Sequence, residues 1–255
     1  MKPRVIPVLL LDSKKRLVKT VEFDHETYIG DPFNVIRIFN EKEVDEICIL
    51  DIYASVDGRK PDRGFVAELA AECFMPLGYG GGIATPADAE HLFSVGIEKV
   101  VIGEHAGNAV LTRSLAEDFG SQAIAACIDC RATADGYTVF TRRGTRRIPH
   151  HPKDYAQRLE AQGVGEIVVQ SIDRDGMRSG YDCNLVQLVA AAVGIPVVAL
   201  GGAGEMSHMA PAINAGASAV ASGSAFVFIG KLRAVLLNYP TTNDLEDLAK
   251  WLRSQ

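Results

Sequence analysis

The 255-residue chain has few of the features that mark specialised protein classes. Its five cysteines are odd in number and irregularly spaced, which does not suit a disulfide framework. The apolar run Val5–Leu11 near its start is too short to span a membrane, and no cleavage site follows it. Basic residues are outnumbered, 26 to 32, so the net charge of -6 disfavours binding to nucleic acid or an anionic membrane. We therefore expect a cytoplasmic, soluble protein.

The chain does show a regular alternation of strand-like and helix-like segments. Hydrophobic residues make up 47% of it, enough for a sizeable core. Short apolar runs, typical of strands buried on both faces, alternate with longer amphipathic segments. Eight such units predict an α/β fold, the (β/α)8 TIM barrel, with a doubly wound open sheet as the less favoured alternative. The runs are Val5–Leu11, Ile47–Leu50, Pro76–Tyr79, Val100–Ile102, Ala123–Asp129, Ile167–Gln170, Pro196–Leu200 and Ala219–Ser222, and the clearest helical segments are Pro32–Lys42, Pro86–Ser94, Lys153–Gln162 and Met206–Ala215.

The second half of the chain repeats the first. A shift of about 120 residues, without a gap, aligns prolines and glycines at the same points of each strand–helix unit. We read this as a two-fold half-barrel repeat within one domain, residues 1–255, with half-barrels at about 1–120 and 121–240 and a C-terminal helix at 243–255. The matched pairs include Pro76 with Pro196, Gly81 with Gly201, Gly82 with Gly202 and Gly103 with Gly223.

Glycine-rich turns follow the third and seventh strands at symmetric positions. Glycine lets backbone N–H groups approach an anion, and each turn runs into a helix N-terminus, so the turns predict phosphate sites. Strand eight ends at Gly223-Ser224, which suits an anion, whereas its counterpart Gly103-Glu104 carries a repelling carboxylate. We call Gly81, Gly82, Gly103 and Glu104 the first-half rim and Gly201, Gly202, Gly223 and Ser224 the second-half rim, and expect phosphate mainly at the second.

Carboxylates stand where strands end, which is where barrel enzymes carry their active sites. Asp51 ends strand two and Asp129 ends strand five, while Asp175 and Gly176 come after strand six, where Gly176 is a further candidate for phosphate binding. Opposed carboxylates can divide general acid and base work, although a strand-end aspartate can equally cap the next loop. The lone pair Cys127 and Cys130 is better explained by strand packing and a flanking loop than by a metal site, and we expect neither metal nor cofactor.

These residues together resemble the cyclase subunit family of imidazole glycerol phosphate synthase, over nearly the whole chain. The family resemblance implies the half-barrel fold, a glutaminase partner that supplies ammonia, and a bis-phosphorylated ribulosyl substrate that is cleaved and cyclised. The motifs that carry it are Val5-Ile6-Pro7, Gly30-Asp31-Pro32, Leu50-Asp51-Ile52, Tyr79-Gly80-Gly81-Gly82-Ile83, Phe119-Gly120-Ser121-Gln122, Ile128-Asp129, Gly165-Glu166-Ile167, Asp173-Arg174-Asp175-Gly176 and Gly201-Gly202-Ala203-Gly204.

The resemblance gives some of the family's catalytic residues a counterpart in this chain, but not all of them. It carries one of the family's two opposed aspartates onto Asp129 and the lysine of the first loop onto Lys19. The position of the other aspartate is Leu10 in this chain, and the nearest carboxylate is Asp12. Because side chains alternate along a strand, Asp12 shares a side with Leu10 and is expected to face the cavity about 7 Å further out, as a displaced substitute.

Four charged residues stand near the starts of strands: Arg4, Glu46, Lys99 and Glu166, here called the charged ring. On charge alone they could be a solvated ion-pair cluster of little energetic weight. The family resemblance implies instead an ammonia gate on the N-terminal barrel face, where the glutaminase binds.

Several functions stay open at this point. The chain could hand ammonia to the amidination of an acetamido nucleotide sugar in surface-polysaccharide synthesis, with a third amidotransferase chain, as related paralogues are thought to do. It could make imidazole glycerol phosphate for histidine biosynthesis. It could also be a catalytically silent conduit, or a phosphosugar isomerase, which would have no need of the charged ring. The substitutions at Leu10 and Glu104 favour the first.

Overall fold

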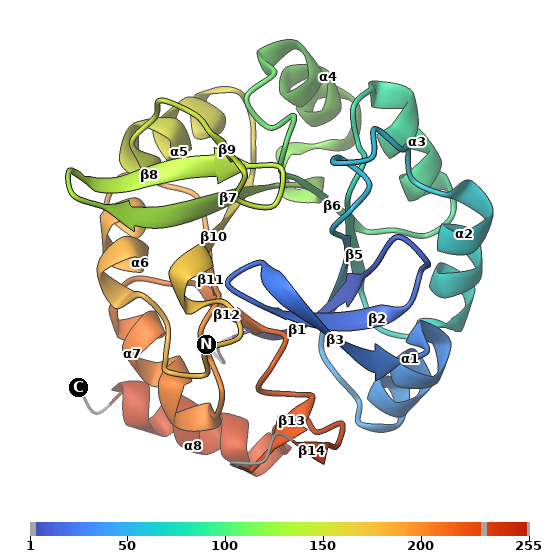
Figure 1. Cartoon of the computed structure of the whole chain (residues 1–255), viewed down its shortest axis with the longest axis vertical. Helices are drawn as coiled ribbons and strands as arrows, with labels where there is room; N and C mark the ends of the chain where they lie inside the picture. Colours follow the sequence, from blue (N-terminus) through green and yellow to red (C-terminus); the bar gives the residue numbers. More distant parts are fainter. Residues whose placement is uncertain (1–3, 231–233, 254–255) are drawn as a thin grey trace.

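The computed structural model describes residues 4–230 and 234–253. Eight parallel strands each pair with two neighbours, and the ring closes where the first pairs with the last, Val5 opposite Val220. The predicted (β/α)8 barrel is confirmed (Figure 1). Its strands are β1 (Arg4–Leu11), β4 (Ile47–Asp51), β5 (Leu77–Gly80), β6 (Lys99–Ile102), β7 (Ile124–Thr133), β10 (Glu166–Ser171), β11 (Val197–Leu200) and β12 (Ala219–Ser222).

Helices surround the barrel and cover its outer face (Figure 1). Side chains alternate along β1, so that Leu9 and Leu11 pack outward under the helices while Ile6 and Val8 fill the barrel interior. The helices are α1 (Pro32–Glu41), α2 (Arg63–Glu72), α3 (Pro86–Ser94), α4 (Ala109–Phe119), α5 (Pro152–Ala161), α6 (Cys183–Ala190), α7 (Met209–Asn214) and α8 (Thr242–Arg253), with short 3-10 helices at Ser121–Ala123, Ile172–Arg174 and Met206–His208.

The helix starts follow from local sequence. Asp31 precedes Pro32, and its side chain accepts a hydrogen bond from the backbone of Asn34, so α1 begins with a capped first turn. At α3 the carboxylate of Asp88, in the first turn, accepts hydrogen bonds from the hydroxyl and the backbone N–H of Thr85, at 2.7 and 2.9 Å. The predicted helices consequently agree with the observed ones to within a residue or two, except that Met206–Ala215 divides into a 3-10 turn and α7.

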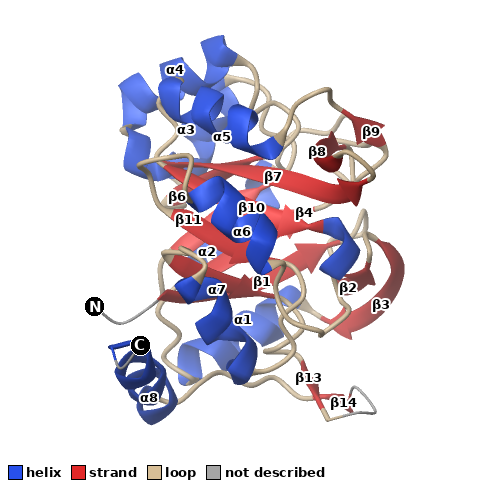
Figure 2. Ribbon diagram, turned by 90° about the vertical axis from the view of Figure 1, so that its left-hand side faces the viewer, coloured by secondary structure: helices blue, strands red, loops and turns tan. Residues whose placement is uncertain are grey.

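Two hairpins extend the barrel beyond the predicted strands. β1 continues into β2 (Leu17–Val21) and β3 (Asp24–Gly30), and β7 continues into β8 (Gly136–Thr141) and β9 (Arg146–Arg147). Both project from the same end of the barrel, where the parallel strands finish (Figure 2). A further short pair, β13 (Phe228–Ile229) and β14 (Ala234–Val235), leads toward α8.

One local expectation is wrong. β7 runs through to Thr133, so Cys130 lies inside the strand and is fully buried, not beside a loop. Its thiol and that of Cys127 face different surroundings, because Cys130 packs in the core and Cys127 lines the interior cavities. All five cysteines are free. The half-barrel repeat and the single-domain assignment stay predictions.

No helix within residues 4–230 and 234–253 is both long enough and apolar enough to cross a membrane.

Candidate active site

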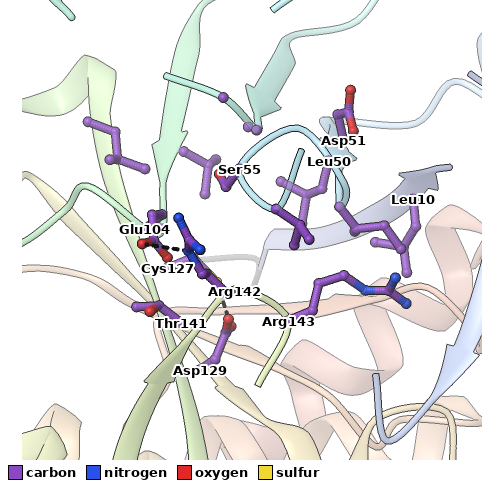
Figure 3. Close-up of a pocket in the computed structure, with 18 of the residues that line it drawn as sticks. Leu10, Leu50, Asp51, Ser55, Glu104, Cys127, Asp129, Thr141, Arg142 and Arg143 are labelled. Carbon is purple, nitrogen blue, oxygen red and sulfur yellow. Dashed lines mark hydrogen bonds and ion pairs between the residues drawn. The ribbon is translucent and has the colours of Figure 1, made fainter. Parts of the chain in front are cut away.

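The largest opening on the barrel axis lies at the C-terminal ends of the strands. It is a cavity of about 130 Å³ whose wall combines strand-end side chains with the two hairpins (Figure 3). The structure brings two of the predicted catalytic residues, Asp51 and Asp129, to this main pocket, together with the first-half rim. Other lining residues are Leu10, Leu50, Ser55, Cys127, Thr141, Arg142, Arg143 and Gln170.

Asp129 is the carboxylate best suited to proton transfer. It stands on β7, with Cys127 Sγ 3.5 Å from Oδ1. Burial raises the pKa of Asp129 to about 7, because a charge is poorly solvated inside the barrel. A carboxyl group with that pKa can both accept and release a proton near neutral pH, which is the property a general acid or base requires.

Lys19 and Asp175 lie beside the second-half rim, in a smaller cavity that all four rim residues and Gly176 also line. Lys19 is buried, and its Nζ donates to the carbonyl of Val8 at 2.6 Å. Burial lowers the pKa of Lys19 to about 8, although the carboxylate of Asp175 acts in the opposite direction. A buried cation beside glycine backbone is chemically suited to hold a phosphate.

Two glycines of this cavity are explained by close contacts. A Cβ on Gly223 would lie 2.5 Å from Lys19 Nζ, so any side chain there would displace the ammonium group. A Cβ on Gly176 would lie 2.0 Å from the carbonyl oxygen of Thr20, whose hydroxyl donates to Asp175 at 2.6 Å. The glycines therefore keep the first loop, with Lys19, packed against the loops after β10 and β12.

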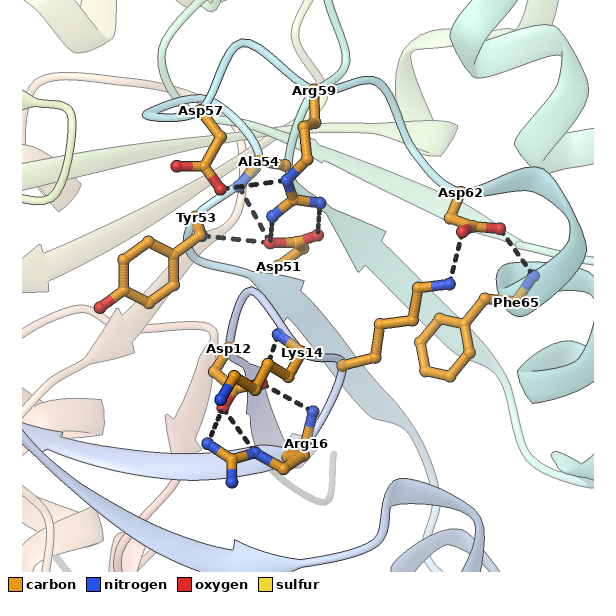
Figure 4. Close-up of polar contacts among 11 residues, drawn as sticks. Asp12, Lys14, Arg16, Asp51, Tyr53, Ala54, Asp57, Arg59, Asp62 and Phe65 are labelled. Atoms are coloured by element: carbon orange, nitrogen blue, oxygen red, sulfur yellow. Dashed lines mark hydrogen bonds and ion pairs between the residues drawn. The ribbon is translucent and has the colours of Figure 1, made fainter.

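Leu10 and Asp12 do not lie on the same surface. Leu10 borders both cavities, whereas Asp12 is not among the described residues that line either. The chain turns after β1, and the Asp12 carboxylate accepts hydrogen bonds from the backbone of Lys14 and Arg16 and from the Arg16 guanidinium, at 2.7 to 2.9 Å (Figure 4). Burial raises the pKa of Asp12, but these bonds outweigh it and hold the pKa below its usual value. The strand alternation that predicted a cavity-facing Asp12 ends at this turn.

Asp51 is already engaged by its neighbours. It forms two hydrogen bonds with the Arg59 guanidinium, at 3.0 and 3.2 Å, and accepts two more from the backbone of Tyr53 and Ala54 (Figure 4). These bonds fix the loop that follows β4. Asp51 thus borders the main pocket as an organiser of its wall, while Asp129 is free of such ion pairs among the contacts described.

The first-half rim has a feature that the sequence interpretation missed. Glu104 pairs with Arg142 at 3.4 Å (Figure 3) and with Arg146 at 3.1 Å, and both arginines come from the β8–β9 hairpin. The available signal was the run Thr141-Arg142-Arg143-Gly144-Thr145-Arg146-Arg147, four arginines in an acidic chain.

Arg143 joins the two hairpins over the pocket. It donates to the carbonyl of Phe23 at 3.0 Å and to Glu26 at 2.9 Å, and its guanidinium lies 4.1 Å from the ring centre of Tyr53. Glu26 also accepts a hydrogen bond from the Tyr53 hydroxyl. Three loops distant in sequence are therefore fastened together at the mouth of the main pocket.

At the opposite end of the barrel the charged ring is assembled. Glu166 bonds Arg4 and Lys99, the latter at 2.5 Å, and Glu46 lies 3.7 Å from Arg4 and 3.9 Å from Lys99. Burial raises the pKa of Glu46. The four residues form one network in which positive and negative side chains alternate. They lie together at the strand starts, where the sequence pattern predicted them.

A narrow axial cavity begins at this ring and runs toward the main pocket. Glu46, Lys99 and Glu166 line one end, and the rest of its wall is mostly apolar. It shares lining residues with the main pocket and with the cavity of the second-half rim, so only side chains separate the three spaces. The shared residues are Leu50, Val101 and Cys127 with the first, and Val8 and Leu200 with the second.

The sequence of this chain is similar to the sequences of a known protein family. Residues 4–233 match the family described as histidine biosynthesis protein. The chain is a member of that family. A relative from Pseudomonas aeruginosa (strain PAO1), named "Putative imidazole glycerol phosphate synthase subunit hisF2", is 50% identical over 95% of this chain and 98% of its own length.

Other members of the family are similar over the same span. A Leptospira interrogans protein named "Putative imidazole glycerol phosphate synthase subunit HisF" is 42% identical over 97% of this chain and 99% of its own length. A Vibrio vulnificus protein named as hisF3 is 41% identical over 96% of this chain and 95% of its own length. The chain therefore belongs with the HisF-like proteins of this family.

Proposed function

We propose that this chain is the ammonia-accepting cyclase or lyase subunit of a glutamine amidotransferase complex, with a glutaminase bound at the charged-ring face. Membership of the HisF-like family supports the coarse assignment, since its relatives are named as subunits of imidazole glycerol phosphate synthase. The single observation that carries the proposal is the axial cavity, which begins at a ring of paired charges and is separated from the pocket of Asp129 only by side chains that line both, such as Leu50 and Cys127.

The cavity suits ammonia by its chemistry. An apolar passage excludes the ammonium ion, because an unpaired charge is costly to desolvate, but a small neutral molecule can pass. The charged ring closes the entrance with ion pairs, and the bond between Lys99 and Glu166 must open to admit a molecule to the axis. At the far end, Asp129 can transfer protons during carbon–nitrogen bond formation.

The finer assignment follows from Leu10. Leu10 lines the main pocket, and it stands at the position where the family resemblance implies the second of the two opposed carboxylates. We therefore propose that the substrate differs from that of histidine biosynthesis. The chain would supply ammonia for amidination of an acetamido nucleotide sugar in surface-polysaccharide synthesis, acting with a glutaminase and a third amidotransferase chain.

The test uses the complex of this chain with its glutaminase, supplied with glutamine and the bis-phosphorylated ribulosyl substrate. The wild-type complex should hydrolyse glutamine but form imidazole glycerol phosphate at least 100-fold more slowly than Leu10→Asp, in which the acid is restored. Efficient synthesis by the wild type would instead assign the chain to histidine biosynthesis. The intact Asp129, Lys19 and second-half rim favour that second candidate.

A catalytically silent conduit is a third possibility, and Asp129 separates it from the others. Under the proposal, Asp129→Asn abolishes formation of the pathway product in cells. If product formation continued unchanged in cells that carry Asp129→Asn, the barrel would act only as a scaffold and passage.

A further inference from the structure

Glu104 holds a carboxylate oxygen that no protein group satisfies. The side chain is only 7% exposed, and both arginine contacts, from Arg142 and Arg146, are made through Oε1. Oε2 is buried and has no hydrogen-bond partner. Buried carboxylate oxygens are rarely left without a donor, because a desolvated charge that gains no hydrogen bond destabilises the fold. The missing donor is a property of this site that needs an explanation.

A second unsatisfied group stands beside it. The hydroxyl of Thr141 is also buried without a partner. Thr141 precedes Arg142 on the β8–β9 hairpin, and both Thr141 and Glu104 line the main pocket as well as an outer cavity next to it (Figure 3). The wall between these two spaces thus offers one acceptor that needs a donor and one hydroxyl that can donate or accept.

A phosphate does not complement this wall. Its oxygens only accept, or carry charge, and would face the unpaired Oε2 at close range. A hydroxyl group does complement it, because it can donate to Glu104 and accept from Thr141, and an N–H group can donate to Glu104 or to the oxygen of Thr141. Each arginine of the hairpin end near the pocket already has a carboxylate partner: Arg142 and Arg146 have Glu104, and Arg143 has Glu26.

We infer that the first-half rim binds a hydroxyl or N–H group of the substrate through Glu104, with Thr141 in support. The substrate then carries a single phosphate group, held at the second-half rim by Lys19 and the glycine loops, and a hydrogen-bond donor at its other end. The inference rests on the proposed phosphate site at the second-half rim and narrows the class of substrate that the pocket accepts.

The test compares two sugars that differ at one end only, ribulose 5-phosphate and ribulose 1,5-bisphosphate. Their binding to the full-length protein is measured by isothermal titration calorimetry. The wild type should bind the monophosphate at least as tightly as the bisphosphate. In Glu104→Gln, the charge is removed and an N–H donor is added, so the affinity ratio should move toward the bisphosphate by at least fivefold.

Glu117→Gln is the matched control, since it removes the same charge from an exposed position on α4 and should leave the ratio unchanged. A shift smaller than fivefold in Glu104→Gln, or a wild type that prefers the bisphosphate tenfold, overturns the inference. If Glu104→Gln does not fold, the inference is tested by the wild-type affinity ratio and by Thr141→Val. We expect Thr141→Val to weaken binding of the monophosphate and to leave binding of the bisphosphate unchanged. If neither sugar binds, the phosphate site at the second-half rim is overturned. The proposed ammonia-accepting function is tested separately, by whether product formation is coupled to glutamine hydrolysis.

Discussion

The carboxylate of Glu166 bridges the two cations at the base of the barrel, with one oxygen on Arg4 and the other 2.5 Å from Lys99. Lys99 also approaches Glu46, at 3.9 Å, so it closes the network on the side that lines the axial cavity. Lys99 is 18% exposed and Glu166 6%, so the pair is shielded from water more than a surface ion pair is. Of the two cations in the charged ring, Lys99 is the one that lines the axial cavity.

Lys99→Ala should uncouple the two activities of the proposed complex. Without the ammonium group the entrance loses its closure, and ammonia from glutamine escapes or is misdirected. We expect the yield of product per glutamine hydrolysed to fall at least fivefold, while the rate with added ammonium salt changes less than twofold. The exposed Lys42→Ala serves as control. Equal loss of the glutamine-driven and ammonium-driven rates would show that Lys99 supports the fold and has no gating role.

Asp129 links the active site to stability. Its folded pKa, about 7, lies above the ordinary 3.8, so the folded protein binds a proton more tightly than the unfolded chain does. The penalty for ionising Asp129 therefore grows as pH rises from about 4 to 7 and is constant above. Asp129→Asn removes it and should stabilise the protein increasingly over that range, by up to about 4 kcal/mol at pH 8. Urea denaturation at pH 4.5, 6 and 8 measures the trend.

The exposed Asp135→Asn, on the turn between β7 and β8, is the control and should give no pH-dependent difference. A stability difference for Asp129→Asn that is the same at all three pH values would contradict the raised pKa.

Gly223 and Gly103 allow a matched comparison of the two rims. Gly223→Ala places a methyl group 2.5 Å from Lys19 Nζ, whereas a Cβ on Gly103 meets nothing within 4 Å. We expect Gly223→Ala to weaken binding of inorganic phosphate at least tenfold, since the ammonium group must move, and Gly103→Ala to leave it unchanged. Phosphorus NMR titration measures both. Equal affinities in the two variants would place the phosphate away from Lys19.

The barrel could be predicted from sequence because its strands are buried on both faces. The run Pro196–Leu200, for example, is continuous and apolar, begins with a proline and is followed by Gly201, and it agrees closely with the observed strand Val197–Leu200. The hairpins could not be found in this way. The strand Asp24–Gly30 is largely polar and exposed, and β2 is its only strand partner within the described residues.

In the candidate site, the residues at strand ends could be predicted from the sequence, but the contacts made by the hairpins could not. Asp51 and Asp129 were found because the ends of parallel strands must converge on one face. The partners of Glu104 could not be found, because Arg142 and Arg146 reach the first-half rim only after their hairpin folds back over the pocket. A sequence pattern gives no register between a hairpin tip and a strand end that is about 40 residues away.

The two possible roles of Asp12 predict opposite results for its substitution. A displaced catalytic acid would be needed for activity, whereas a residue that stabilises the turn after β1 would be needed for stability. Asp12→Asn removes a buried charge that pairs with Arg16 and should lower stability by about 1–2 kcal/mol. Because the folded pKa of Asp12 is below its ordinary value, this contribution is present at neutral pH and is lost on acidification below about pH 4. Ammonium-driven activity should stay within twofold of wild type.

Asp24→Asn, exposed at the start of β3, is the control and should change neither stability nor activity. A tenfold loss of activity in Asp12→Asn at unchanged stability would make Asp12 the missing acid, against its observed bonds to Lys14 and Arg16. Preserved activity with reduced stability would confirm that the carboxylate serves the turn after β1. The wall beside Asp129 would then be apolar at Leu10, and a substrate that reacts there would need a proton donor other than Asp12.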